Sequence, residues 1–421
     1  MKQDQIASLT GLRFVAALCV VISHATAMMV KFSDPPYIVN ILEQLASDGM
    51  TLFFVLSGFV IHYNYSTLIS SRAGLKEFFI ARFARLYPLY FLCVCFDLLM
   101  KFSYNQFPID RMGALPYYAT LTQSWAYMVI KDHSLIYQFG LLPQVTWSIS
   151  TEFFFYLAFP FICIWVSKLK SVRSGLTSSV IVCVAAIATS NAIYTNYANI
   201  NQLGTSLFGP VAAIEQDSLF RWLAYFSPYM RIFEFALGCL CAFIYMKMKK
   251  TSVSEREQRF GLWLSITAIV CLPIWHSLMF SGPGASRWRL LFTPLHLNIG
   301  AGPLLAIVIF CCARYQTFLS SAMSGRKIVL CGEASYSIYL LHFLIINAFR
   351  YESATITSWN VGLGVAAQFI VVLAATVGLA LVSYTLIEVP SRNGIRRLAA
   401  SISQRQSSIR LSEPANSREP G

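Results

Sequence analysis

The chain has 421 residues, of which 56% are hydrophobic and 12% are charged, whereas soluble domains have roughly 45–50% apolar and 25% charged residues. Because a water-soluble fold could not bury so much apolar surface, this composition excludes an ordinary soluble protein. The formal net charge is +13, but Lys and Arg cluster between apolar runs instead of following one surface, which argues against a nucleic-acid partner.

About ten apolar runs predict transmembrane helices, because each approaches the roughly 20 residues that cross a bilayer as an α-helix. In chain order these runs cover residues 12–31, 49–69, 83–102, 145–167, 176–195, 227–246, 261–280, 296–313, 334–349 and 361–387. The predicted fold class is therefore all-α, a polytopic membrane protein whose single membrane domain covers residues 1–397.

The connection between the third and fourth runs is long and amphipathic. Its residues 115–142 contain four aromatic side chains of the kind that favours the membrane–water interface, namely Tyr117, Tyr118, Trp125 and Tyr127. We therefore expect this segment to lie on the membrane or to dip into it.

The distribution of Lys and Arg predicts the orientation, because cytoplasmic loops retain positive charge. With the N-terminus inside, about 22 of these residues lie on the inner side and about 9 on the outer side, so both termini are predicted to be cytoplasmic. Residues 398–421 are rich in Ser, Arg and Pro, which predicts a disordered basic cytoplasmic tail. The first run also resembles a cleavable signal peptide, but we expect it to be retained because it carries Arg13 and His24.

The cysteines show no spacing that suggests a metal site. The sequence has 11 of them, with no Cys-x-x-Cys pair and no Cys/His pattern typical of zinc, and most lie within apolar runs. We expect them to be small buried residues, with neither a metal nor disulfides.

Ionisable side chains inside the runs are the candidate functional residues, because such groups in a membrane usually face a cavity or a partner. Arg13 and His24 are about three helical turns apart, so they share one helix face and are separated by about 16 Å along its axis. His24 is suited to proton transfer near neutral pH, although a structural role is the alternative. Glu152 has a similar predicted depth and could orient or stabilise the imidazole.

Arg82 and Arg85 lie at i and i+3 at the cytoplasmic start of the third run. Their fork-shaped guanidinium groups match phosphates, although ordinary positive-inside anchoring is the alternative reading. The Ser57-Gly58 step among phenylalanines is more typical of close helix packing than of a binding site.

Five short motifs follow one another along the chain. They are Leu9-Thr10-Gly11-Leu12-Arg13 continuing to Ser23-His24-Ala25, the phenylalanine stretch ending in Ser57-Gly58-Phe59, Arg82-Phe83-Ala84-Arg85 with Tyr87-Pro88, Trp147-Ser148-Ile149-Ser150-Thr151-Glu152, and Ser335-Tyr336-Ser337-Ile338-Tyr339-Leu340-Leu341-His342. Together they resemble the signatures of the acyltransferase-3 family of bacterial membrane acyltransferases, over about residues 8 to 397. Thr10, Thr51 and Phe153 depart from the family pattern, and these departures could alter the choice of acceptor or the tuning of the site.

The resemblance implies a membrane O-acyltransferase that moves an acetyl or other short acyl group from cytoplasmic acyl-CoA to a hydroxyl of an envelope or exopolysaccharide carbohydrate. Arg82, Arg85 and Arg13 would bind the acyl-CoA. His24 would be the general base, with Glu152 and Arg13 as further catalytic residues. Further residues that would line the site are Ser57, Trp147, Tyr336 and His342, the last along the acyl-CoA path.

The resemblance also sets expectations about partners. Acyl-CoA is expected as a donor substrate, with no bound cofactor. The other expected partners are a carbohydrate acceptor, the lipid bilayer of the bacterial inner (cytoplasmic) membrane, and proteins of polysaccharide biosynthesis. We expect the stand-alone form, without the SGNH-type domain that many relatives carry after the membrane domain.

Two other function classes stay open. A polyhelical transporter or flippase of a glycan precursor would also place Arg, His and Glu in a membrane, although no internal repeat of the kind found in inverted-repeat transporters is visible. A noncatalytic receptor or assembly partner is the second alternative. Within the acyltransferase reading, direct transfer and a covalent acyl-histidine are both compatible with the sequence.

Overall fold

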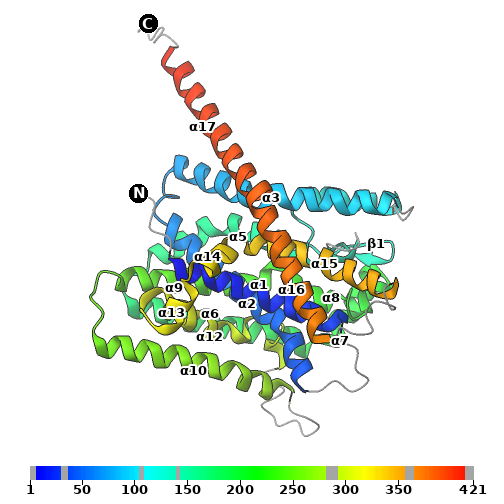
Figure 1. Cartoon of the computed structure of the whole chain (residues 1–421), viewed down its shortest axis with the longest axis horizontal. Helices are drawn as coiled ribbons and strands as arrows, with labels where there is room; N and C mark the ends of the chain where they lie inside the picture. The colour runs from blue at the N-terminus through cyan, green and yellow to red at the C-terminus, as the bar shows by residue number, and fades with distance from the viewer. Residues whose placement is uncertain are drawn as a thin grey trace.

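The computed structural model of the chain describes residues 6–29, 37–103, 109–138, 143–280, 293–355 and 365–412, and helices account for most of them (Figure 1). The long helices are α1 (Ala7–Met29), α2 (Tyr37–Tyr65), α3 (Arg72–Ser103), α5 (Pro143–Ser167), α6 (Val172–Thr195), α9 (Pro228–Met248), α10 (Glu255–Phe280), α12 (Gly302–Arg314), α15 (Ser335–Thr355), α16 (Val365–Ser383) and α17 (Val389–Ser412). The shorter elements are η1 (Ile109–Ala114), α4 (Leu115–Ala119), β1 (Val129–Ile130), β2 (His133–Ser134), η2 (Leu135–Tyr137), α7 (Tyr197–Phe208), η3 (Pro210–Ala213), α8 (Leu219–Arg221), η4 (Trp222–Phe226), η5 (Thr293–Leu295), η6 (Ile299–Ala301), α13 (Phe318–Met323), α14 (Arg326–Glu333) and η8 (Tyr384–Glu388).

In the described ranges, 8 helices are long and apolar enough to cross a membrane. The pair α14 and α15, bent by 69°, passes the same test when taken as one span, which raises the number to 9. The predicted run at 296–313 corresponds to the apolar helical stretch Ile299–Arg314, which is too short to qualify. The all-α polytopic fold is therefore confirmed.

The ends of the helices separate into two groups. In Figure 1 the start of α1, the connection from α9 to α10 and the far end of α17 lie on the left, whereas α7, α8 and β1 lie on the right. This is the grouping expected if the first set faces the cytoplasm. Which side of the membrane each group occupies stays a prediction from the charge pattern.

Helices α2 and α9 approach each other closely in the core because glycines face each other there. A Cβ on Gly58 would lie 2.0 Å from the carbonyl oxygen of Phe235, and a Cβ on Gly238 would lie 2.0 Å from that of Val55. A side chain at either position would therefore push the two helices apart. The Ser57-Gly58 step thus serves close helix packing, as is common for small residues between membrane helices.

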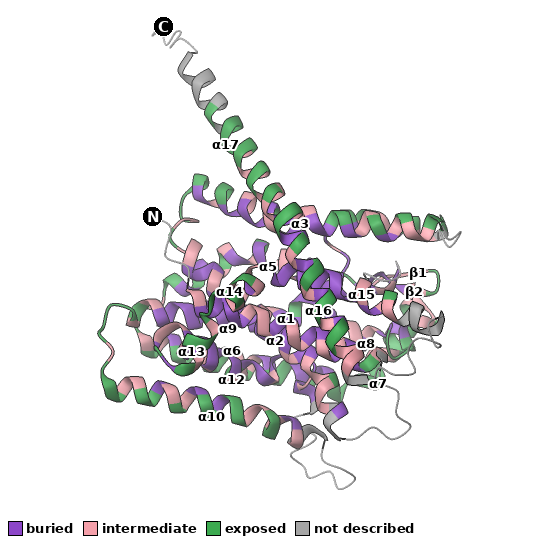
Figure 2. Ribbon diagram, viewed as in Figure 1, coloured by how far each residue is buried: buried purple, intermediate pink, exposed green. Residues whose placement is uncertain are grey.

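Exposed residues lie along the peripheral helices (Figure 2), and many of them are large and apolar. On α10, for example, Phe260 is 62% exposed and Trp263 is 66% exposed, and on α3 Leu99 is 65% exposed. Apolar surface of this extent suits contact with lipid acyl chains and is rare on a soluble monomer.

The segment at 109–138 forms short helices and a two-stranded hairpin of β1 and β2. Within the segment, the Tyr118 hydroxyl donates to the carbonyl of Leu135 at 2.6 Å. Trp125 donates to the carbonyl of Ser150 in α5 at 3.0 Å, and Tyr127 donates to that of Asp217, just before α8, at 2.6 Å. Trp125 and Tyr127 therefore fasten this segment to the rest of the protein. Its position at the membrane–water interface stays a prediction.

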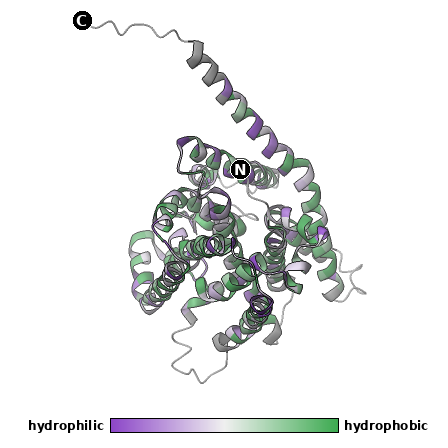
Figure 3. Cartoon of the chain, turned by 90° about the vertical axis from the view of Figure 1, so that its left-hand side faces the viewer, coloured by the Kyte–Doolittle hydropathy of each residue, from purple (hydrophilic) through white to green (hydrophobic). Residues whose placement is uncertain are grey.

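The first part of the predicted tail is helical in the structure. The chain continues as α17 to Ser412, and the residues after it lie outside the described ranges, so disorder of the tail stays a prediction. The physical reason for the helix is the spacing of Ile395, Leu398 and Ile402, which recur at helical intervals among good helix formers such as Arg, Ala and Gln. Figure 3 shows hydrophilic turns along the part of this helix that leaves the bundle.

Candidate active site

A cavity of about 60 Å³ lies among α1, α2, α3, α5 and α15. We call it the arginine cavity, because Arg13 from α1 and both Arg82 and Arg85 from α3 line it. The other predicted site residues on its wall are Ser57, Glu152 and Tyr336. The structure thus brings together six residues that the sequence analysis selected from five separate segments.

Arg82 is buried on the inner side of α3 and is held by aromatic rings. Its Nη2 donates to the Tyr65 hydroxyl at 3.0 Å, and its Cζ lies 4.8 Å from the Tyr65 ring centroid and 5.9 Å from that of Tyr156. Its buried Nε has no hydrogen-bond partner among the described residues. Because leaving a buried guanidinium N–H without an acceptor costs free energy, this donor is suited to an anionic ligand.

Glu152 faces the arginine cavity, and its hydrogen bonds differ from those expected. Its Oε1 accepts from the Ser57 hydroxyl at 3.1 Å and from the Tyr156 hydroxyl at 2.6 Å. The similar predicted depth of Glu152 and His24 suggested that the carboxylate could orient the imidazole, but the hydrogen-bond partner of His24 is a different residue. Two residues at the same depth can point in different directions around a helix bundle, which hydropathy does not reveal.

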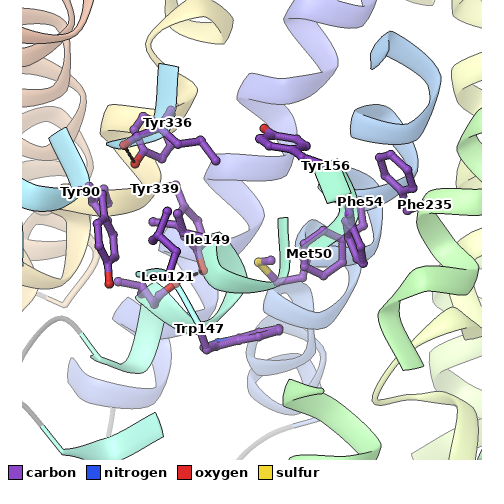
Figure 4. Close-up of a cluster of buried hydrophobic side chains, with 14 of the residues drawn as sticks. Met50, Phe54, Tyr90, Leu121, Trp147, Ile149, Tyr156, Phe235, Tyr336 and Tyr339 are labelled. Atoms are coloured by element: carbon purple, nitrogen blue, oxygen red, sulfur yellow. Dashed lines mark hydrogen bonds between the residues drawn. The ribbon is translucent and has the colours of Figure 1, made fainter. Parts of the chain in front are cut away.

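A second cavity, of about 140 Å³, is lined by His24 from α1 and Trp147 from α5, and we call it the histidine cavity. Met50 and Tyr339 line both cavities, so these two side chains form the wall that the cavities share. Figure 4 shows Met50, Trp147 and Tyr339 within the surrounding cluster of buried hydrophobic residues.

His342 is the hydrogen-bond partner of His24. His24 Nδ1 lies 2.9 Å from His342 Nε2, and the two rings are nearly parallel, at 5°. His342 was expected along the acyl-CoA path, but it does not line the arginine cavity. It is fully buried behind His24, so it acts on the site through that residue.

The hydrogen bonds of this pair assign the positions of the protons. His342 Nδ1 lies 2.5 Å from the carbonyl oxygen of Tyr339, which can only accept, so this nitrogen carries a proton. Nε2 of a neutral His342 must then accept the proton that His24 Nδ1 donates. This leaves a lone pair on His24 Nε2, which is the state that a general base requires.

Tyr336 and Trp147, the remaining predicted lining residues, are both buried. Tyr336 lines the arginine cavity and donates its hydroxyl hydrogen bond to the carbonyl of Leu86 at 2.6 Å. Trp147 lines the histidine cavity instead. The two predicted lining residues therefore belong to different cavities.

A buried ion pair that was not predicted from the sequence supports the histidine cavity. Arg231 Nη1 lies 2.9 Å from Glu234 Oε1, and both side chains are fully buried. The Arg231 Cζ lies 4.6 Å from the ring centroid of Tyr225 and 5.7 Å from that of Trp147, both of which line the cavity. The signal was present in the sequence, since the two residues lie at i and i+3 inside an apolar run.

Arg221 was also missed, because it lies just before that apolar run and was counted only as an outer positive charge. It lines the histidine cavity with His24. As for metals, no group of three His, Cys, Asp or Glu side chains in the described ranges is arranged to hold an ion.

Comparison with known proteins agrees with the motif series. The acyltransferase-3 family model, described as an acyltransferase domain, matches residues 6–385. The chain is 26% identical over 361 residues to the acyltransferase MdmB of Streptomyces mycarofaciens, covering 82% of this chain and 79% of that protein. No solved structure matches the chain.

Two further relatives are longer than this chain. It is 25% identical over 402 residues to the peptidoglycan O-acetyltransferase OatA of Listeria monocytogenes and 24% identical over 400 residues to the O-acetyltransferase OatA of Staphylococcus aureus. These matches cover 93% and 91% of this chain but only 56% and 57% of the relatives. Because the family model covers nearly the whole chain, this protein belongs to the acyltransferase-3 family and is a multi-pass membrane acyltransferase.

Proposed function

We propose that the protein transfers an acetyl or other short acyl group from cytoplasmic acyl-CoA to a hydroxyl of a cell-envelope or exopolysaccharide carbohydrate. The observation that carries this proposal is the pair of cavities with one common wall, one lined by three arginines and the other by His24. The relatives named O-acetyltransferases support an ester product.

The arginine cavity would receive the donor. Its three guanidinium groups suit the phosphates of CoA, and the unpaired Nε of Arg82 offers a donor that no described residue uses. The pantetheine arm would extend from there toward Met50, whose flexible side chain can yield to a narrow, mostly apolar chain. The thioester would thereby reach the wall of the histidine cavity.

The histidine cavity would receive the acceptor. His24 Nε2 would remove the proton of the acceptor hydroxyl as its oxygen attacks the thioester carbonyl carbon. The carbon–sulfur bond would break, and the departing sulfur of CoA would take the proton from the imidazolium. General-base catalysis of this kind is typically worth about 10²–10⁴-fold in rate.

A strain that lacks the protein provides the test. Envelope glycans and exopolysaccharides from the deletion strain, complemented with wild type, His24→Ala or His133→Gln, are compared for ester-linked acetyl groups by mass spectrometry and NMR. His133 is the matched control, since it lies on β2 and lines neither cavity. Wild type and His133→Gln should restore a specific acetyl ester, and His24→Ala at equal membrane level should not.

Purified protein in lipid nanodiscs separates this proposal from a transporter. Acceptor-dependent release of free CoA from acetyl-CoA is expected of a transferase, whereas a carrier releases none. Unchanged acetylation in the deletion strain together with reduced glycan export would refute the proposal.

A further inference from the structure

Arg221 places a positive charge in the same cavity as the candidate base. It ends the short helix α8 and lines the histidine cavity together with His24. Among the described residues that line this cavity, no other is an Arg or Lys, and none is a carboxylate. The charge of Arg221 is thus not balanced from within the cavity wall.

Two carboxylates outside the wall, Asp217 and Glu234, are already paired with other residues. Asp217, about one helical turn before Arg221, pairs with His133 at 3.0 Å. Glu234, the buried carboxylate of α9, pairs with Arg231 at 2.9 Å. Within the described ranges, the Arg221 side chain itself makes neither an ion pair nor a hydrogen bond.

The rest of the cavity wall is largely aromatic. The Arg221 Cζ lies 5.2 Å from the centroid of the Tyr225 ring, and Trp147 and Phe226 form further parts of the wall. Burial raises the pKa of Tyr137 to about 12, so this lining phenol is neutral and can donate a hydrogen bond. Large aromatic faces with a few polar groups are typical of small-molecule sites.

The half-buried Arg221 guanidinium has no carboxylate partner, so an anionic group on a ligand would bind it favourably. Its planar fork of N–H donors matches a carboxylate or a phosphate. We infer that the acceptor carries a carboxylate or phosphate group near the hydroxyl that His24 activates. The inference rests on the proposed function, since it assigns the histidine cavity to the acceptor. It narrows the acceptor class to anionic sugars or sugar phosphates.

Calorimetric titration of the full-length protein in nanodiscs tests this inference with three soluble probes. Methyl β-D-glucoside is neutral, methyl β-D-glucuronide carries a ring carboxylate, and α-D-glucose 1-phosphate carries a phosphate. We expect one charged probe to bind at least about tenfold more tightly than the neutral one. The identity of that probe distinguishes a sugar carboxylate from a phosphate.

Two variants assign the preference to a residue. Arg221→Gln should remove the preference for the charged probe while leaving the affinity for methyl β-D-glucoside unchanged. Arg111→Gln, in η1 and lining neither cavity, should retain it. Equal affinity of wild type for all three probes, or a preference that survives in Arg221→Gln, would overturn the inference.

Offering the same probes as acceptors with acetyl-CoA keeps the two proposals distinguishable. A binding preference that depends on Arg221, without an acetyl ester on any probe and without CoA release, would support the anionic site and count against the transfer reaction. Acetyl esters formed equally well on neutral and charged probes, without a binding preference, would support the transfer reaction and count against the anionic site.

Discussion

His24 and His342 form a hydrogen-bonded pair in which the carbonyl of Tyr339 fixes the proton positions of both rings. The two histidines are 318 positions apart in the chain, so the packing of α1 against α15 creates the pair. Under the proposed function, His342 is a positioning residue that holds the reactive nitrogen of His24 toward the acceptor.

Replacing His342 therefore tests orientation without removing the base. We expect His342→Ala to lower kcat by roughly 10- to 100-fold, because the His24 ring loses the acceptor that sets its tautomer. The affinity for acetyl-CoA should not change. His342→Gln offers an amide oxygen and should recover part of the loss.

Phe343→Leu is the matched control for this pair. The Phe343 ring packs at 4.9 Å from the His24 ring but offers no hydrogen bond to it, so its replacement should have a much smaller effect on kcat. Similar losses in both variants would mean that packing, not hydrogen bonding, orients His24.

The arginine cavity makes a prediction about the donor phosphates. Arg82→Gln and Arg85→Gln should each raise the KM for acetyl-CoA by about tenfold with little change in kcat, since a lost charge-assisted hydrogen bond costs about 1.5–3 kcal/mol. Steady-state kinetics with acetyl-CoA and its 3′-dephospho analogue checks this. A variant that no longer distinguishes the two donors has lost the partner of the 3′-phosphate. A fall in kcat with unchanged KM would contradict a binding role.

The ion pair between Arg231 and Glu234 predicts non-additive stability effects. Arg231→Met leaves a buried carboxylate without its partner and should destabilise the protein by about 3–5 kcal/mol. Adding Glu234→Leu should recover most of that loss, because both buried charges are then removed. Thermal unfolding in detergent, compared across the two single variants and the double variant, gives the coupling. Additive losses would mean that the pair does not act as a unit.

Gly58 predicts how sensitive the core is to volume. Gly58→Ala places a methyl group where the carbonyl oxygen of Phe235 would be 2.0 Å away, so α2 and α9 must separate. We expect a loss of about 1–3 kcal/mol or more in stability, measured as a lower unfolding temperature. Gly378→Ala is the control, because nothing lies within 4 Å of its added methyl group.

The shared wall predicts that Met50 controls passage between the cavities. Met50→Trp should abolish transfer while acetyl-CoA still binds, because the larger ring would close the wall. Met50→Leu, of similar volume, should remain active. Transfer at wild-type rate by a correctly folded Met50→Trp variant would show that the acyl group takes another path.

Much of the fold could be predicted because it depends on local properties of the chain. The length of an apolar run determines whether it can span a bilayer, and the spacing of Arg82 and Arg85 places both on one helix face. The motif series grouped Arg82 and Arg85 with Arg13 as one binding site, and all three line the same cavity.

The partners inside the site could not be predicted in the same way. Hydropathy gives the depth of Glu152 and His24 but not the direction of each side chain around the bundle, so it could not reveal that Glu152 accepts hydrogen bonds from Ser57 and Tyr156. Composition likewise did not reveal the helix over residues 398–412, which follows the helical spacing of Ile395, Leu398 and Ile402. Arg221 and Arg231 were overlooked because the charge count treated them only as markers of orientation.

The last helical stretch is longer than the hydrocarbon core of a membrane is thick. Ala367–Ile402 covers 36 residues, about 54 Å at 1.5 Å per residue, against a hydrocarbon core of about 30 Å. For a span that begins at Ala367, we therefore expect the hydrocarbon edge near the start of α17, before its charged turn at Arg392. Since α3 packs against both η8 and α17, and Arg85 lies close enough to Glu388 of η8 for their charges to interact, we expect Arg82 and Arg85 near this edge, at the depth of the lipid headgroups. The phosphates of acyl-CoA could then reach Arg82 and Arg85 without entering the hydrocarbon core of the membrane.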